Sequence, residues 1–316
     1  MSSKLKDALE HTKAAEKALK TGFLKWNPDY DIAASEYTKA ATNYKLAGSP
    51  EKAKDAYIKA SDMQRKLGSL FHSAKLLTQA AGIAADLKEA EEVVDLMERA
   101  CSLYREHGAP DTAAMTLSKA GKMCEMSLPD KSIDLYLKAA DLCENDDKVR
   151  EACDYLNQAV RMQLKQKRGI KSAETMKKRI VLLKQVGNVN MAYNVTLGMV
   201  ITYLSEGDYV SANDSYNEGF SLSGFGESDQ AMYCEHFLKA FEEGDEDLLS
   251  KTRSQPTVLH LDTELARLAK LLRLSEVAVP SKPTSGLSEL EEFEQNELNE
   301  DAAPETVVDD FEGGLC

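Results

Sequence analysis

The sequence has few of the residues that interrupt regular structure. Gly and Pro supply only 17 and 8 of the 316 residues, about 8% against a usual ~12%, which argues against collagen-like, low-complexity or loop-rich β architecture. No stretch approaches the ~18 uncharged apolar residues of a membrane-spanning helix, and the N-terminal segment lacks the apolar centre of a secretory signal. None of the six cysteines belongs to a C-x-x-C pair, so neither a disulfide framework nor a zinc site is indicated. These absences favour a cytosolic protein with little irregular structure.

Positive charge is missing from the C-terminal end. Residues 287–316 contain eleven acidic residues and no Lys or Arg, while the net charge of the whole chain is −14, so the rest of the chain is nearly neutral. Nucleic acid requires a clustered basic surface that releases counterions, and we therefore expect no nucleic-acid partner. The acidic end is typical of a disordered, solvated tail, and it would also attract a basic partner.

A sequence repeat with a period of about 20 residues runs through most of the chain. Each copy has a small residue, a large one four positions later and a small one seven positions later, as in Ala33, Tyr37 and Ala40. These positions share one face of an α-helix, where small side chains let helices approach closely and the large one fills the space between them. Clear copies begin at Ala33, Ala53, Ser73, Val93, Ala113, Ser132 and Ala152, with a constant spacing except for one step that is shorter by one position, and weaker copies begin at Ala8, Ala173, Ala192 and Ala212.

This period predicts an all-α fold. One period less a connection of ~4–6 residues leaves helices of roughly 14–16 residues, and short connections make consecutive helices antiparallel. Helix breakers lie between the copies, for example at Gly48-Ser49-Pro50 and Pro129. We therefore expect a right-handed, tetratricopeptide-like α-solenoid of helix hairpins over residues 1–224. The pattern fades afterwards, which predicts a helical bundle that caps the solenoid over residues 225–278 and a flexible acidic tail over 279–316.

Motifs of catalysis and metal binding are missing. The sequence has no phosphate-binding glycine loop, no His-Glu-x-x-His motif and no Gly-x-Ser-x-Gly elbow. The five histidines are scattered without a second ligand three or four positions away, and the many carboxylates suit solvated helix faces. We expect an interaction protein with no catalytic residues, no metal and no cofactor.

An insertion between the first two predicted helices carries three large apolar residues. Phe23, Leu24 and Trp26, the only tryptophan, lie between Gly22 and Pro28. A loop buries such side chains poorly, so they could enter a lipid interface or a pocket of a partner. The alternative is that they cover the end of the first hairpin's core. Bilayer insertion of so few side chains is weak and would need a second, membrane-bound partner.

Two charged segments are further candidates for partner binding. The basic segment forms either solvated helix ends or a positive stripe that attracts an acidic, rod-like partner. It consists of Arg161, Lys165, Lys167, Arg168 and Lys171. The acidic one runs from Glu242 to Asp247 in the predicted cap, and together with the acidic tail it favours a basic receptor at this end of the molecule.

The chain resembles the soluble NSF attachment proteins (SNAPs), and in particular their gamma branch, in three segments: LKTGFLKWNPDYDIAASEYTKAATNYK, GAPDTAAMTLSKAGK and the terminal GGLC. These proteins are adaptors of the N-ethylmaleimide-sensitive fusion (NSF) ATPase. The resemblance implies a solenoid that ends in a helical bundle. It also implies an adaptor that binds the assembled SNARE complex, a syntaxin-containing four-helix bundle, and that recruits and stimulates the NSF hexamer for SNARE disassembly in vesicle fusion and intracellular transport.

The same resemblance assigns roles to individual residues. It places membrane attachment at Phe23, Leu24 and Trp26, and contact with the ATPase at Glu242, Glu243 and Leu315, whereas the basic run from Arg161 is a candidate for SNARE contact. A cytoplasmic protein that is monomeric when free and peripherally associated with membranes is implied.

Two other functions remain open from the residues alone. The first is a generic tetratricopeptide-like scaffold that binds extended peptides, and the second is an enzyme such as a helical-repeat transferase subunit. An adaptor should have a shallow, elongated basic face, a peptide binder a narrow groove with a convergent carboxylate clamp, and an enzyme a closed pocket lined by converging polar groups.

Overall fold

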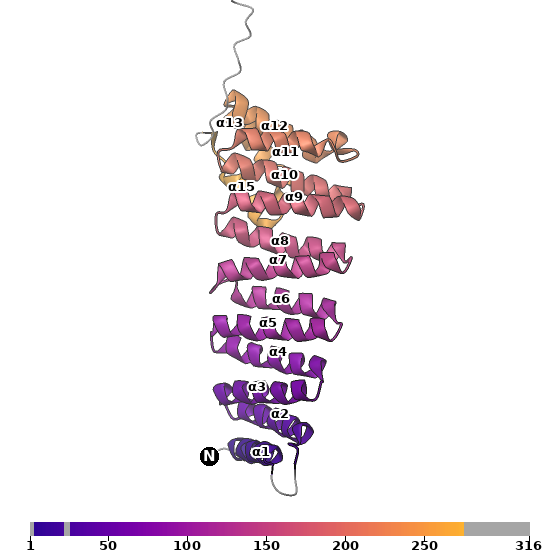
Figure 1. Ribbon diagram of the computed structural model, residues 1–316. Helices are drawn as coiled ribbons and strands as arrows, with labels where there is room; N and C mark the ends of the chain where they lie inside the picture. The colour runs from indigo at the N-terminus through magenta and orange to yellow at the C-terminus, as the bar shows by residue number, and fades with distance from the viewer. Residues whose placement is uncertain (1–2, 22–25, 275–316) are drawn as a thin grey trace, which may run out of the picture. The chain divides into compact units, whose positions relative to one another are not determined.

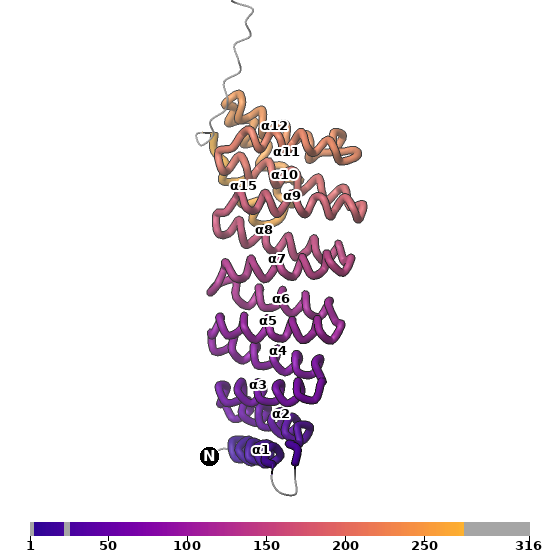
Figure 2. The backbone as a smooth tube through the Cα atoms, in the orientation of Figure 1, coloured from indigo at the N-terminus to yellow at the C-terminus, as the bar shows by residue number. Residues whose placement is uncertain are grey.

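The expected all-α solenoid is confirmed by a computed structural model, which describes residues 3–21 and 26–274. These residues form one compact unit that contains fifteen α-helices, one short 3-10 helix and no strand. Figures 1 and 2 show the helices of residues 3–219 stacked side by side in sequence order, with the last helix folded back beside them. Their bounds are α1 Ser3–Leu19, α2 Tyr30–Leu46, α3 Pro50–Lys66, α4 Leu70–Asp86, α5 Ala90–Glu106, α6 Pro110–Cys124, α7 Pro129–Asn145, α8 Val149–Lys165, α9 Gly169–Gln185, α10 Val189–Ser205, α11 Tyr209–Gly219, η1 Phe225–Glu227, α12 Asp229–Glu243, α13 Glu246–Arg253, α14 Pro256–Leu259 and α15 Thr263–Leu271.

The helices are longer and the connections shorter than expected. Most of the helices from α2 to α10 have 17 residues, which exceeds the expected length, and most of their connectors have three residues rather than four to six. The reason is a residue in the left-handed conformation at the middle of the connector, such as Gly48 with φ 69° or Lys88 with φ 64°. It lets the following N–H turn back onto the helix, as when Ser49 N donates to Tyr44 O at 3.0 Å. Three residues are therefore enough to reverse the direction of the chain.

The connector between α6 and α7 is the exception and explains the one shorter step of the repeat. Helix α6 has only 15 residues, and the connector 125–128 contains no residue with positive φ. Here Leu128 N donates directly to Cys124 O at 2.8 Å. The helix is two residues shorter and the connector one residue longer than elsewhere, so the period shrinks by one.

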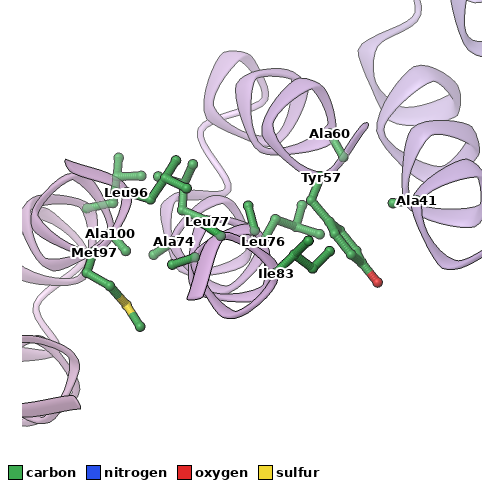
Figure 3. Close-up of a cluster of buried hydrophobic side chains, with 14 of the residues drawn as sticks. Ala41, Tyr57, Ala60, Ala74, Leu76, Leu77, Ile83, Leu96, Met97 and Ala100 are labelled. Atoms are coloured by element: carbon green, nitrogen blue, oxygen red, sulfur yellow. The ribbon is translucent and has the colours of Figure 1, made fainter. Parts of the chain in front are cut away.

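The small residues of the repeat lie where the helices touch. Ala60 and Ala100 are fully buried, and the large residues Tyr57, Leu77 and Met97 are at most 8% exposed. Figure 3 shows these side chains between neighbouring helices of the stack. The interpretation of the repeat as a packing pattern is therefore confirmed.

The regular stack changes character after α10. Helix α11 stops after 11 residues, and the chain then folds back so that α12 and α15 pack on α10. Helix α10 is apolar on all sides and has twelve buried residues, which is the sequence signature of a helix covered on two faces. Gly198 of α10 lies so close to Leu265 of α15 that a Cβ at this glycine would be 2.7 Å from Leu265 Cδ1. Within the described part of the chain, no helix is long and apolar enough to cross a membrane.

The glycine in α10 should be required for docking of α15. Gly198→Leu should lower the free energy of unfolding by about 1–3 kcal/mol, because the new side chain and Leu265 compete for one space. Gly82→Leu in α4 is the matched control, since no atom lies within 4 Å of a Cβ placed there, and it should leave stability unchanged or raise it by about 0.5–1 kcal/mol. Urea unfolding followed by circular dichroism measures both; equal effects would contradict the packing role of Gly198.

Candidate functional site

The odd-numbered helices form one face of the solenoid, and several of their lysines form ion pairs between successive odd-numbered helices. Lys138 Nζ of α7 lies 2.5 Å from Glu98 Oε1 of α5, and Lys178 Nζ of α9 lies 2.8 Å from both Asp141 and Glu144 of α7. We call this surface the odd-helix face. These ion pairs link successive odd-numbered helices, while other lysines of the same helices, such as Lys59, Lys131 and Lys184, are exposed.

A buried lysine on the same face makes the strongest of these links. Lys54 of α3 is 7% exposed, and its Nζ lies 2.5 Å from a carboxylate oxygen of both Glu89 and Glu92 at the start of α5. Burial by itself would lower the pKa of Lys54, but the two hydrogen bonds outweigh it and raise that pKa above its ordinary value. Sequence reasoning missed this cluster, because the two glutamates follow the lysine by 35 and 38 positions in the chain.

The even-numbered helices form the opposite face, and there the cations are available. An open groove of about 500 Å³ between α6 and α8 is lined by Lys119, Lys122 and Arg161 together with two tyrosines, Met115 and other polar side chains. A second groove, of about 430 Å³, lies between α2 and α4 and includes Lys75. We call this surface the even-helix face.

Four of these even-face cations differ from the paired lysines of the odd-helix face. Among the described residues, no carboxylate oxygen lies within 4 Å of the charged atoms of Lys75, Lys119, Lys122 or Arg161. Glu125 is the carboxylate that lines the α6–α8 groove, and it accepts a hydrogen bond from Tyr136 Oη at 2.8 Å. These four cations are therefore not compensated by an ion pair within the described residues.

The structure does not bring the basic run together as one stripe. Only Arg161 lines the α6–α8 groove. Lys165 pairs with Glu125 at 3.6 Å and Arg168 with Asp130 at 2.6 Å. Lys167 is the left-handed residue of the α8–α9 connector, with φ 56°, and the exposed Lys171 lies in the first turn of α9.

Two lysines of the groove were not among the sequence-based candidates. Lys119 and Lys122 of α6 line it together with Arg161 of α8. The signal that could have found them is the doubled repeat, because helices that share a face recur every ~40 residues in such a solenoid.

The tryptophan of the inserted loop is exposed. The connector between α1 and α2 spans residues 20–29, of which Phe23 and Leu24 lie outside the described residues. The side chain of Trp26 is 83% exposed. It therefore does not cover the core of the first hairpin, which was the alternative to a partner or lipid contact.

The acidic residues of the cap lie at a helix junction. Glu242 and Glu243 are exposed in the last turn of α12, and Lys239 approaches Glu243 at 3.9 Å. Asp245 has a structural role, because its side chain accepts a hydrogen bond from Leu248 N at 2.8 Å and caps α13. Leu315 lies outside the described residues.

A buried arginine joins the solenoid to the cap. Arg179 of α9 is 9% exposed, burial lowers its pKa, and its Nη1 donates to Asn157 Oδ1 at 2.9 Å. Asn157 Nδ2 in turn donates to Asp262 Oδ2 at 3.4 Å, and Asp262 caps α15. The chain of hydrogen bonds ties α8 and α9 to the last helix.

Nothing in the described residues is arranged for redox or metal chemistry. No group of three or more His, Cys, Asp or Glu side chains that could hold a metal ion occurs there. The five cysteines between Cys101 and Cys234 are buried, and burial raises the pKa of the Cys101 thiol to about 11, which keeps it protonated and unreactive at neutral pH.

Comparison with known proteins assigns the family. The family model described as "Soluble NSF attachment protein, SNAP" matches residues 6–255. The chain belongs to the soluble NSF attachment protein (SNAP) family. This SNAP chain is 30% identical over 254 residues to the gamma-soluble NSF attachment protein of Arabidopsis thaliana, with 80% of the chain and 87% of the relative covered. The gamma protein of Dictyostelium discoideum is 28% identical over 256 residues, with 81% and 79% covered.

The alpha branch is more distant from this SNAP chain. The alpha-soluble NSF attachment protein of Saccharomyces cerevisiae is 24% identical over 260 residues, with 78% of the chain and 88% of the relative covered. Among solved structures, a signal-transduction ATPase with a tetratricopeptide repeat sensor from Pyrococcus horikoshii matches 85% of the chain and 44% of its own length, at 17% identity and a TM-score of 0.41. SNAP proteins are adaptors rather than enzymes, and family membership gives this chain an NSF attachment role in SNARE-related trafficking.

Proposed function

We propose that this SNAP-family chain binds assembled SNARE complexes through its even-helix face and recruits and stimulates the NSF ATPase through its C-terminal end. The observation that carries the proposal is the grouping of cations in open grooves between even-numbered helices. Lys119, Lys122 and Arg161 line one such groove, and no ion pair to a described residue engages them, unlike Lys138, which pairs with Glu98. Charges that are not used for stability are available to a partner.

The expected partner surface is long, acidic and rod-shaped. The cations of the even-helix face are spread from α4 to α8, so a partner that contacts all of them must extend along several repeats. Such contacts are individually weak and are screened by salt, but they steer association and set the orientation. A four-helix SNARE bundle has this shape, and the stiff stack would transmit to it a force exerted by the ATPase.

The C-terminal end is the proposed ATPase-facing end. The exposed Glu242 and Glu243, the acidic segment 287–316 and Leu315 together offer negative charge and one apolar anchor. ATP hydrolysis takes place in the partner, and this chain supplies attachment. At the other end, the loop with Phe23, Leu24 and the exposed Trp26 is the proposed point of peripheral membrane attachment, which assigns the chain to the cytoplasmic side of membranes.

The generic peptide-binding scaffold is the second candidate, and the lining of the grooves favours the adaptor. A clamp for a peptide carboxylate needs several cations that converge on one point. In the groove between α2 and α4, Lys39 is instead engaged with Glu36 at 2.6 Å, which leaves Lys75 as the available lysine of that groove.

Reversal of charge on the even-helix face should weaken SNARE binding. The triple variant Lys119→Glu, Lys122→Glu, Arg161→Glu should bind a purified SNARE bundle at least about tenfold more weakly, because three favourable long-range interactions become repulsive. Binding is measured by fluorescence anisotropy of a labelled SNARE bundle at two salt concentrations, and wild-type affinity should fall with salt.

The matched control reverses three exposed lysines of the odd-numbered helices, with Lys59→Glu, Lys131→Glu and Lys184→Glu. It changes the net charge by the same amount, and its SNARE affinity should stay within about threefold of wild type. Equal losses in the two triple variants would show that net charge, and not the even-helix face, governs the association.

Removal of the end of the acidic tail should separate the two binding activities. A chain that lacks residues 300–316 should stimulate ATP turnover by NSF less than the full chain does, while its affinity for the SNARE bundle stays near wild type, because the even-helix face is intact. The two quantities are measured on the same protein by phosphate release and anisotropy. A parallel fall of both would refute this division of roles.

A further inference from the structure

Exposed apolar side chains gather at one edge of the N-terminal repeats. The connectors α1–α2 and α3–α4 both join the end of an odd-numbered helix to the start of an even-numbered one, so they lie on the same edge of the stack, at the right in Figure 1. Four large apolar residues are exposed along it: Trp26 by 83%, Ile32 by 51%, Leu67 by 42% and Phe71 by 37%. We call these four residues the apolar edge.

The two connectors are direct neighbours. Lys66 Nζ at the end of α3 lies 5.0 Å from the centroid of the Tyr30 ring at the start of α2. Asp31 of α2, Gln64 of α3 and His72 of α4 line one groove. Because the start of α2, the end of α3 and the start of α4 meet in this way, the members of the apolar edge belong to one surface strip rather than to separate sites.

The strip keeps its apolar side chains exposed because the fold holds them there. The ring of Phe71 packs edge-on against Tyr104 at 5.2 Å and in a tilted arrangement against His107 at 5.4 Å between centroids. These contacts hold the partly exposed ring in a fixed position. Leu67 is the C-cap residue of α3 and directly precedes Gly68, the left-handed residue of the connector with φ 73°.

Basic residues flank the same strip. Lys20, Arg65 and Lys66 are exposed beside the apolar edge and outnumber the exposed Asp31, which directly precedes Ile32. Farther along this side of the stack the character changes, because the α7–α8 connector exposes Asp146 and Asp147. Apolar and aromatic side chains with flanking lysine and arginine are the composition that binds the headgroup region of an anionic membrane. Such a membrane would repel the acidic α7–α8 connector, so the membrane-binding surface would end before it.

We propose that the apolar edge lies against an anionic lipid bilayer. The solenoid then docks edge-on through the two neighbouring connectors α1–α2 and α3–α4, and not through the inserted loop alone. The inference deepens the membrane part of the proposed function and rests on it, but it does not depend on SNARE or ATPase binding. Two contacts carried by one rigid body reinforce each other, because the first makes the second intramolecular. The second connector thus supplies the help that a short apolar loop needs.

Vesicle binding tests the proposal. The full chain is mixed with vesicles of phosphatidylcholine and phosphatidylserine, or of phosphatidylcholine alone, and the bound fraction is measured by co-sedimentation. Trp26 is the only tryptophan, so its emission reports the environment of the apolar edge without a label. Wild type should bind the anionic vesicles more tightly, with a blue shift of the emission.

The decisive variant is Leu67→Ser with Phe71→Ser, which should lower the partition coefficient on anionic vesicles by at least about fivefold and reduce the blue shift. The matched control, Leu46→Ser with Met126→Ser, changes residues that are 66% and 96% exposed at connectors of the opposite edge, and it should bind like wild type. Arg65→Glu with Lys66→Glu tests the same strip without loss of the Phe71 packing, and circular dichroism checks the helix content of every variant.

Each alternative outcome is distinct. The proposal is overturned if both strip variants bind like wild type while the triple variant Phe23→Ser, Leu24→Ser, Trp26→Ser loses binding, which would leave the loop as the whole membrane contact. It is also overturned if the strip variants lose SNARE affinity in the absence of vesicles, since the strip would then be a protein-binding surface. Absence of wild-type binding to any vesicle would refute the membrane part of the proposed function together with this inference, and would leave the SNARE and ATPase parts standing.

Discussion

The close approach of helix backbones at small residues is the interaction on which the rest of the structure depends. Ala60 and Ala100 are fully buried at contacts between neighbouring helices, and each is preceded by a large side chain that fills the adjacent space, Tyr57 and Met97 respectively. Interiors packed in this way tolerate little change of volume. The repeat therefore fixes the spacing between helices, and this spacing decides which side chains meet across the stack.

A regular stack gives the molecule two faces and two edges with separate tasks. Because each connector reverses the chain, residues two repeats apart come together on one face, where Lys138 meets Glu98 and Lys178 meets Asp141. These pairs link successive helices of the odd-helix face. The opposite face keeps cations such as Lys119 and Arg161 at the surface of open grooves, and the cap covers this face only at its far end, where Gly198 makes room for Leu265. The surface proposed for partners thus combines open grooves with cations that the stack does not use in ion pairs.

Much of the fold follows from the sequence, because small residues and helix breakers are local signals. The period of the repeat, the antiparallel helices and the change of pattern near the cap could all be predicted. The connector length could not be predicted, because it depends on residues such as Lys88 that adopt a left-handed conformation. A non-glycine residue gives no sequence signal for that conformation. The site was harder. The ion pairs of Lys165 and Arg168 and the grouping of Lys119 with Arg161 arise from contacts between distant segments, so no local pattern predicts them. The all-round apolar sequence of α10, in contrast, is a local signal that could have predicted a helix covered on two faces.

The most direct test of the packing account is the unfolding free energy of Ala100→Leu, compared with that of Ser102→Leu in the same helix. Ala100 is fully buried and Ser102 is exposed, so both variants add a leucine to α5 but only one enlarges a helix contact. The account predicts a loss of about 1–3 kcal/mol for Ala100→Leu and a change within about 0.5 kcal/mol for Ser102→Leu. If urea unfolding gave the two variants the same stability, close packing at the small residues would not be what holds the solenoid together.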